Sequence, residues 1–587
     1  MPSPIRVQPW VVAVAATAVV FTMAPGRAAS TPSRPTTDVG GTIAPGTVWS
    51  AAGSPYRTIS NIEVPAGVTL VIEAGVEVRM GDSDRIDVAG AVKANGSAAA
   101  PITVTADDSA APWNGIILEA TAGPSEFSHV RFSGNGARPA AMLEVRTSDV
   151  LVSECVFEDA GGVGLDITAA SPRVERSVFR NAGVASAMPP GALRIRGESD
   201  PVIVDNLFQS NENAPVFLDA NASPTLAGNR FEFNGWNGVR LAGSVRRPVT
   251  LPSLGPRRWS YWVDPNGITV RDTGTFTVSP GTTLEFISNG MRVEGTLRVM
   301  GAAGAEVVMT TASLNPAPGR WRDIEFAASS TGFDPETGQG SVIQHAVIEY
   351  GGSVDTGAIR VSAASPRIAN TVIRHSGNRG ITITGNGARP ILVGNLFLGL
   401  DSDPNGVGVY TAAGAEPRVS FSIFQDNRTG IETDAGAKPV IGPLNRFDRN
   451  LGFGVLNRDD SLCVAAEGND WTDPAGPFDP SPRDDSCGLG DNPGAGDVVS
   501  DNVDYQPWAG VVDRPLIVSP RCGTQRSAAP LVEGWAPPES RVTIYDNFEP
   551  LGETTAEAGA EALTAFSFQA PRLAPGSHVL VARAEAG

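Results

Sequence analysis

A short segment recurs along this chain, and this repetition limits the folds that the chain can adopt. Each copy has alternating apolar residues, a small polar residue and an apolar pair that ends in Phe, as in Val174–Phe179 and Val204–Phe208. The Phe positions recur every 22, 29 and 23 residues in a first series and every 27 and 23 in a second; they are Phe157, Phe179, Phe208, Phe231, Phe397, Phe424 and Phe447. A period of about 20 to 50 residues indicates a repeat architecture rather than an ordinary globular domain.

Each repeat is predicted to be one coil built from very short strands. A second apolar run accompanies each Phe segment, for example Gly164–Ile167 and Gly380–Ile383. Alternation over four or five residues indicates a half-buried strand, and the Gly, Asn, Pro and Asp between the runs indicate turns. Stacked coils would bury their inward residues and align the Phe positions and the Asn, Ser and Thr positions coil over coil. Leucine-rich repeats need Leu-x-x-Leu-x-Leu and a helical half, and neither occurs.

A longer duplication, which contains the short repeats, also occurs in the sequence. Corresponding segments keep their order at offsets of 205 to 214 residues; they include Val64–Leu70 with Val278–Leu284 and Trp113–Ile116 with Trp321–Ile324. We therefore expect two homologous solenoid units, residues 40–247 and 259–510, with the junction in the Pro- and Arg-rich stretch Val245–Arg258.

These motifs resemble a known group of secreted proteins. Pro280–Leu284, Val293–Leu297, Trp321–Ile324 and the Asn395–Phe397 type of coil are similar to right-handed parallel β-helix proteins of the pectate-lyase-like type, and Asn469–Trp508 resembles their closing motif. The resemblance covers roughly residues 40–510. It implies an all-β, right-handed parallel β-helix, but it leaves the activity open because the group includes lyases, hydrolases and adhesins.

Both ends of the chain carry separate signals. Arg6, the apolar run Trp10–Met23 and the segment Gly26–Ala29, in which small residues flank Arg27, predict a signal peptide over residues 1–29. The run is shorter than the roughly 20 residues of a membrane span, although an uncleaved anchor is the alternative. Residues 514–587 alternate in strand fashion and resemble an immunoglobulin-like module that lacks its last strand, so we expect a partial β-sandwich there. The protein is expected to be secreted or on the cell surface.

The four cysteines fit an oxidising compartment. Cys463 and Cys487 flank a loop rich in Asp, Pro and Gly, and a disulfide between them would restrain it. We expect Cys155 to be a buried small side chain and Cys522 to be an odd thiol near a domain junction. No Cys-x-x-Cys occurs, so zinc and thioredoxin-type chemistry lack support.

The net charge and the absence of catalytic motifs limit the functions that the sequence supports. A net charge of −19 argues against nucleic-acid and anionic-lipid partners. The resemblance implies that enzymes of this type would cluster acidic residues for calcium with an Arg base, or use paired aspartates in short motifs. Asn-Thr-Asp, Gly-Asp-Asp, Gly-His-Gly and Arg-Ile-Lys are all absent. We therefore assign no catalytic residue, cofactor or metal site.

The candidate site residues have structural explanations. Five acidic pairs lie in predicted turns, where solvated Asp favours turn geometry; they are Asp82/Asp84, Asp107/Asp108, Asp401/Asp403, Asp459/Asp460 and Asp484/Asp485. Asp401 and Asp403 are the best calcium candidates because oxygen ligands crowd their loop, and Asp426 follows Asp401 by 25 residues, close to one coil. His129 and His345 recur by duplication, and His375 has no evident acidic partner.

Two hypotheses follow. The first is a non-enzymatic binding or spacer protein whose partner is a polysaccharide or a cell-surface component. The second is a polysaccharide lyase or glycoside hydrolase of the pectate-lyase-like superfamily. Two or three acidic residues that converge with an Arg from successive coils would favour the second.

Overall fold

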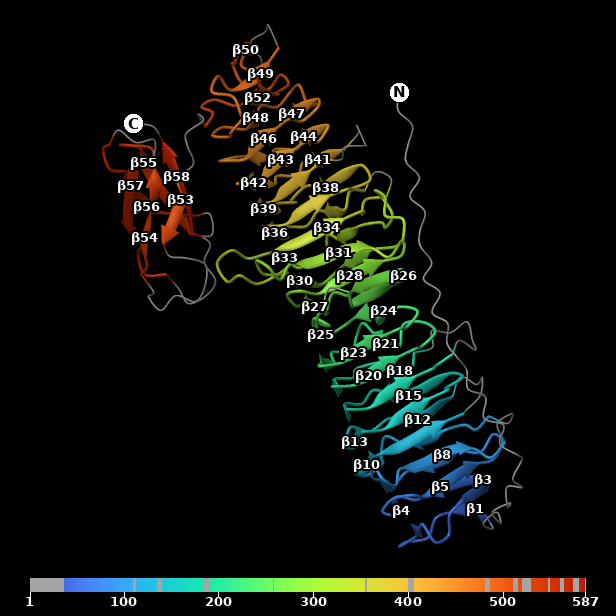
Figure 1. Ribbon diagram of the computed structural model, residues 1–587. Helices are drawn as coiled ribbons and strands as arrows, with labels where there is room; N and C mark the ends of the chain where they lie inside the picture. The colour runs from blue at the N-terminus through green and yellow to red at the C-terminus, as the bar shows by residue number, and fades with distance from the viewer. Residues whose placement is uncertain are drawn as a thin grey trace, which may run out of the picture.

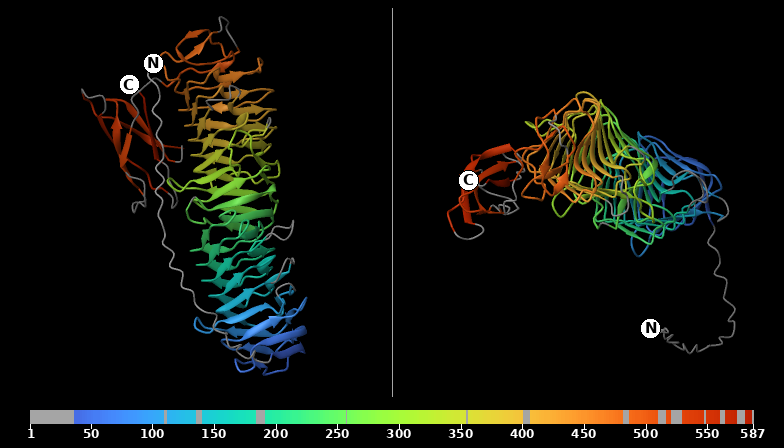
Figure 2. Two further views of the ribbon diagram at one scale, coloured as in Figure 1. Left: turned by 45° about the vertical axis from the view of Figure 1, so that its right-hand side comes forward. Right: turned by 90° about the horizontal axis from the view of Figure 1, so that it is seen from above.

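Parallel strands stacked coil over coil make up most of the molecule, as the computed structural model shows (Figures 1 and 2). The fold class predicted from the sequence is confirmed: all regular structure in the described residues is β-strand. The structure describes residues 36–108, 112–134, 140–183, 191–256, 258–353, 356–399, 406–480, 486–509, 516–519, 529–546, 549–559, 564–573 and 580–585. The predicted signal peptide, Asp401, Asp403, Asp484, Asp485 and Cys522 lie outside these ranges. None of the described residues forms a helix that could cross a membrane.

One face of the solenoid, here named the lateral ladder, runs through both halves of the molecule without a break. Its strands pair in parallel and in register, so that Leu165 lies beside Leu193 and Ile167 beside Ile195. The lateral ladder consists of β1 (Thr37–Thr42), β3 (Tyr56–Val64), β6 (Ile86–Val88), β9 (Ile116–Leu118), β12 (Ala141–Val145), β15 (Val163–Thr168), β18 (Leu193–Arg196), β21 (Val216–Asp219), β24 (Gly238–Val245), β26 (Ser260–Val270), β29 (Met291–Val293), β32 (Ile324–Phe326), β35 (Ile359–Ser362), β38 (Arg379–Thr384), β41 (Val407–Ala412), β44 (Thr429–Thr433) and β47 (Phe453–Asn457).

A second face, the Phe ladder, carries the repeated Phe positions. Its strands are β5 (Glu77–Met80), β8 (Ile102–Ala106), β11 (Val130–Ser133), β14 (Val156–Glu158), β17 (Val178–Arg180), β20 (Leu207–Gln209), β23 (Arg230–Glu232), β28 (Thr283–Phe286), β31 (Val307–Thr311), β34 (Ala346–Glu349), β37 (Val372–Arg374), β40 (Leu396–Leu398), β43 (Ile423–Gln425) and β46 (Arg446–Asp448). The long strands β3 and β26 pair with both ladders, which therefore form one 31-stranded sheet.

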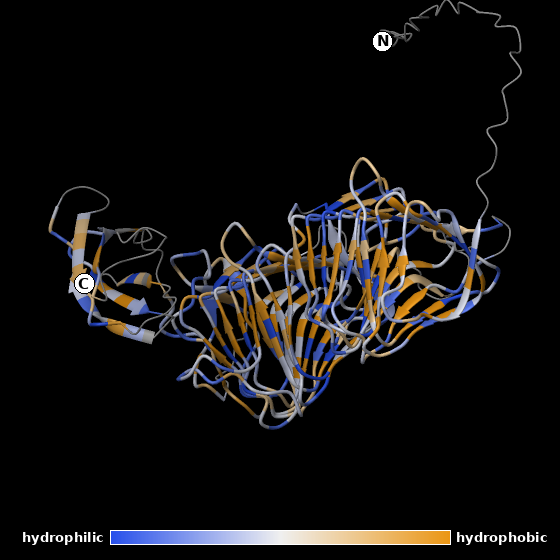
Figure 3. Cartoon of the chain, turned by 90° about the horizontal axis from the view of Figure 1, so that it is seen from below, coloured by the Kyte–Doolittle hydropathy of each residue, from blue (hydrophilic) through white to orange (hydrophobic). Residues whose placement is uncertain are grey.

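The predicted internal Phe stack is confirmed in each half of the solenoid. From Phe132 to Phe231, neighbouring rings stack with centroids 4.8 to 5.2 Å apart. In the second half, Phe397, Phe424 and Phe447 stack likewise, and Trp471 continues the series. Hydrophobic and hydrophilic residues alternate along the strands (Figure 3), which buries every second side chain.

Polar ladders run beside the Phe stack, as the sequence predicted. Asn206 Nδ2 donates to the carbonyl oxygen of Val174 in the preceding coil at 3.1 Å, and Asn445 Nδ2 donates to Val419 at 2.8 Å. These amides donate to the carbonyls of buried strand residues, Val174 and Val419, whose backbone is out of reach of water.

The third face is interrupted near the predicted junction of the two units. One sheet of eight strands runs from β2 (Val48–Trp49) to β22 (Thr225–Ala227), and a separate sheet of ten strands runs from β25 (Pro248–Leu251) to β52 (Val503–Asp504). Because β24 and β26 pair directly, the two repeat units form one continuous solenoid.

The last coil is followed by a closing segment with its own small sheet. This sheet contains β49 (Pro477–Asp479), β50 (Asn492–Pro493) and β51 (Gly496–Val498). The structure joins Cys463 and Cys487 in a disulfide with 5.2 Å between the Cα atoms. Cys155 is a buried free thiol.

The C-terminal residues form a separate body with antiparallel strands. One three-stranded sheet contains β53 (Leu516–Ser519), β54 (Leu531–Ala536) and β57 (Thr564–Gln569), and the other contains β55 (Arg541–Asp546), β56 (Glu549–Thr555) and β58 (Leu580–Glu585). The two sheets share a core that includes Val532, Ile544 and Phe566. This body lies beside the C-terminal half of the solenoid (Figure 1), where the rings of Tyr545 and Phe421 meet edge to face.

Candidate functional site

The outward positions of the lateral ladder form lines of side chains along the solenoid. Every second residue of a strand points outward, and the parallel register places these residues side by side on consecutive strands. From β15 to β26 one such line reads Asp166, Arg194, Phe217, Arg240 and Trp262. Charged and aromatic side chains thus succeed one another at one residue per coil.

At the C-terminal end of this line, aromatic rings gather around an arginine. We name Phe217, Trp236, Arg240, Trp262 and Asp264 the aromatic cluster. Trp236 lies in the turn before β24, and its ring stacks on Trp262 with centroids 5.3 Å apart and planes 14° apart. The guanidinium carbon of Arg240 lies 5.7 Å from the centroid of the Trp262 ring, within cation–π range. Each of the three rings is half-buried, so part of each meets solvent.

The charges of this line are paired within the protein. Arg240 donates from Nη2 and Nε to Asp264 Oδ2, at 2.6 and 3.2 Å. Burial raises the pKa of Asp264, but hydrogen bonds from Arg240 and the Asn266 backbone outweigh it, so the pKa lies below its ordinary value. Three coils before Arg240, Asp166 is buried and ion-paired with both Arg194 and Arg196 of the next strand.

A second group, the carboxylate cluster, lies further along the same ladder. It consists of Glu294, Asp323 and Glu325 with Arg292 and Arg360, from β29, β32 and β35 and the residues beside them. Arg360 Nε donates to Asp323 Oδ2 at 2.9 Å, and its Nη2 lies 2.8 Å from Glu325 Oε2. Arg292 Nη1 lies 2.7 Å from Glu325 Oε1, and Arg292 Nε lies 3.1 Å from Glu294 Oε1.

The carboxylates of this cluster have different proton affinities. Burial raises the pKa of Asp323 and outweighs the attraction of Arg360. The hydrogen bond from Arg292 lowers the pKa of Glu294, which is more exposed. Carboxylates with separated pKa values are a feature of acid–base sites, although structural ion-pair networks also shift pKa values.

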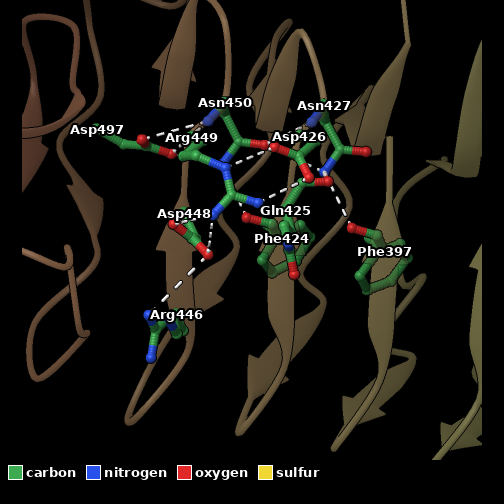
Figure 4. A network of polar contacts seen from close by, with 10 residues as sticks. All are labelled: Phe397, Phe424, Gln425, Asp426, Asn427, Arg446, Asp448, Arg449, Asn450 and Asp497. Atoms are coloured by element: carbon green, nitrogen blue, oxygen red, sulfur yellow. Dashed lines mark hydrogen bonds and ion pairs between the residues drawn. The ribbon is translucent and has the colours of Figure 1, made fainter. Parts of the chain in front are cut away.

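The calcium candidates of the sequence analysis, Asp401 and Asp403, lie outside the described residues, so only Asp426, close to one coil after Asp401, can be followed. Arg449 Nε and Nη2 donate hydrogen bonds to the two carboxylate oxygens of Asp426, each at 2.9 Å, and Arg449 Nη1 lies 3.2 Å from Asp448 (Figure 4). The charge of Asp426 is therefore already neutralised by the next coil. No group of three His, Cys, Asp or Glu among the residues described could hold a metal ion.

The other candidates of the sequence analysis lie apart from both clusters. Asp84 accepts a hydrogen bond from Thr58 Oγ1 at 2.7 Å, and Asp459 accepts one from the backbone of Ser461 at 3.0 Å. His129 and His345 both have positive φ, at 50° and 45°. His129 Nε2 lies 2.7 Å from Glu154, and the ring of His375 stacks on Tyr350 at 5.1 Å; for His345, burial lowers the pKa.

Sequence reasoning missed both clusters because it searched for motifs rather than for coil spacing. Asp166, Arg194, Phe217, Arg240 and Trp262 are separated by 28, 23, 23 and 22 residues, which match the period of the Phe series. Polar and aromatic residues repeated at one coil length on the outward positions of strands would have revealed the line.

Comparisons with known proteins give one family match, over part of the solenoid, and weak similarities to solved structures. A family described as the right handed beta helix region matches residues 114–251. No curated protein sequence matches the chain. Among solved structures, a mannuronic acid specific polysaccharide family 6 lyase from human gut microbiota is 11% identical, with 72% of this chain and 83% of that chain covered and a TM-score of 0.21. A mutant tailspike protein of E. coli bacteriophage HK620, in complex with pentasaccharide, is 11% identical, with 89% and 86% covered and a TM-score of 0.18. The family match supports the β-helix assignment of the coils that it covers.

Proposed function

We propose that this protein binds a polysaccharide along its lateral ladder without cleaving it. The observation that carries the proposal is the placement of Phe217, Arg240 and Trp262 in register on consecutive strands. Because the sequence predicts a signal peptide, we propose that the protein acts outside the cytoplasm, either secreted or attached to the cell surface.

The chemistry of the aromatic cluster matches that of a sugar ring. A pyranose presents C–H groups on its faces and hydroxyl groups around its rim. Aromatic rings supply a flat apolar surface for the faces, and a charged pair such as Arg240 with Asp264 supplies donors and acceptors for hydroxyl groups. Strands lie about 4.8 Å apart, a distance comparable with the length of one pyranose unit, so an extended glycan could meet one outward side chain per coil.

A binding titration of the full chain tests this proposal. Trp262→Ala removes the ring that contacts both Trp236 and Arg240 and should weaken binding to a glycan at least about tenfold. Trp535→Ala is the matched control, because Trp535 is exposed but belongs to β54 in the C-terminal body. Equal affinity of the two variants, or no binding by the parent chain to any neutral or uronate polysaccharide, would contradict the proposal.

The carboxylate cluster supports a second candidate, cleavage of a polysaccharide as a lyase or glycoside hydrolase. Here acidic residues converge with Arg360 from successive coils, and the raised pKa of Asp323 suits a proton carrier. Incubation with uronate and neutral polysaccharides, with and without calcium, tests it. Unsaturated or reducing ends that Asp323→Asn abolishes and Asp426→Asn does not would favour the enzyme; binding without such ends favours the first proposal.

A further inference from the structure

Building on the proposed function, we infer that Phe233 is an additional sugar-stacking residue of the aromatic cluster and that the ligand is an uncharged polysaccharide. Phe233 lies in the turn between β23 and β24, three residues before Trp236. The residue is 79% exposed, so packing within the protein does not account for an aromatic side chain here.

The backbone of Phe233 makes this choice of residue more unusual. Its φ is 54°, in the left-handed region where bulky side chains are rare. The corresponding turns of the preceding coils hold Asp159, Asn181 and Ser210, also with positive φ, and these short polar residues tolerate that conformation better. Phe233 therefore adds both backbone strain and exposed apolar surface. Strain of this kind clusters at ligand sites, where the gain comes from binding.

The turn holds Phe233 in a fixed place beside the cluster. Asn234 Nδ2 donates to the carbonyl of Phe208 at 3.0 Å and to Asn237 Oδ1 at 2.9 Å. Trp236, on the same turn, stacks on Trp262 and donates from Nε1 to Ser260 Oγ at 3.2 Å. Because these bonds fix the turn on both sides of Trp236, the exposed ring of Phe233 extends the apolar surface, and the turn backbone need not become ordered when a ligand binds.

The charge balance of the site favours a neutral ligand. The aromatic cluster contains one arginine and one carboxylate, Arg240 and Asp264, and these are paired with each other. The cluster therefore has no net charge with which to attract a carboxylated sugar, and the chain as a whole carries −19. A uronate would add like charge, whereas an uncharged glycan meets only stacking surfaces and hydroxyl-binding groups.

Calorimetric titration with an oligogalacturonate and with its carboxyl-reduced, uncharged counterpart tests the inference. The parent chain should bind the uncharged form at least about tenfold more tightly. Phe233→Asn should weaken that binding about tenfold while the melting temperature stays the same or rises, because Asn tolerates the left-handed conformation. Leu451→Asn is the matched control: it removes another exposed apolar side chain, 74% exposed, from the turn before β47 and should leave affinity unchanged.

The outcomes separate this inference from the proposed function. If Trp262→Ala weakens binding and Phe233→Asn behaves like Leu451→Asn, Phe233 is not a binding residue and the inference is wrong, while the proposed function stands. Preference for the uronate form would overturn the assignment of an uncharged ligand. If the parent chain binds neither these nor other glycans, the proposed function fails and the inference fails with it.

Discussion

Phe208 shows how one side chain helps to hold neighbouring coils in register. Its ring is buried and stacks on Phe179 and Phe231 at 5.0 and 5.2 Å. Phe208→Ala should lower the free energy of unfolding by about 3 to 5 kcal/mol. The neighbouring coils are held in register and cannot move together to fill the cavity that the ring leaves. Urea denaturation measures the change. Leu207→Ala, on the half-buried outward position of the same strand, is the control, and an equal loss there would show that the stack has no special weight.

Asp497 gives a prediction about pH. Its carboxylate ends an Asn ladder, accepting hydrogen bonds from the Asn450 backbone and side chain. Burial raises the pKa of Asp497, and Asp448 nearby adds to the rise. Because the folded state then binds the proton more readily than the unfolded chain, stability should rise as the pH falls through the folded-state pKa, until the unfolded chain is protonated as well.

Asp497→Asn should remove this dependence. The amide oxygen can still accept from Asn450, as Asn229 accepts from Asn206 elsewhere in the solenoid. The free energy of unfolding at pH 7 should increase by up to about 1 kcal/mol. Thermal melts between pH 4 and 7, values chosen to span the ordinary Asp titration and neutrality, measure the effect. Asp501→Asn, at an exposed position of the same segment, should leave the pH profile unchanged.

At the scale of elements, the closing segment depends on its disulfide. Cys463 and Cys487 are 24 residues apart, and a link over such a loop contributes about 3 kcal/mol by restricting the unfolded chain. Reduction should therefore increase amide hydrogen exchange in residues 458–509 and leave the coils of the first half unchanged. Burial raises the pKa of Cys155 to about 12, so in a Cys522→Ser background an alkylating reagent should label the two reduced cysteines long before Cys155. Early labelling of Cys155 would mean that the coils themselves open.

The same scale shows what sequence reasoning could and could not predict. The Phe and Asn positions repeat in sequence because each contacts its own copy in the next coil, so register follows directly from spacing. The pairing of Arg360 with Asp323, 37 residues away, could not be read in this way because the coil between them is lengthened by loops. Trp236 lies in a turn, where residues follow neither the two-residue alternation of a strand nor the coil-length repeat, so its position could not be predicted. Outward residues need only avoid the core, so their sequence pattern is weaker than that of the inward ones.

At the scale of the whole molecule, stability should be passed from coil to coil. Each coil contacts only its neighbours, and the third face is interrupted between β22 and β25 while the lateral ladder continues. Phe208→Ala should therefore raise hydrogen exchange most in β17 to β23, and much less beyond β26. An equal increase at β40 to β46 would show that the two halves unfold as one cooperative unit.

The uninterrupted lateral ladder also has a mechanical consequence. Hydrogen bonds between coils point along the solenoid, so a force that pulls the first and last coils apart would load the coils in series. Every coil would then bear the same tension, and the weakest coil would open first. The fibre would then lengthen in steps, each releasing the chain of a single coil, such as the 22 residues from Phe157 to Phe179 or the 29 from Phe179 to Phe208. A molecule built in this way yields coil by coil, whereas a domain loaded in shear resists and then breaks at once.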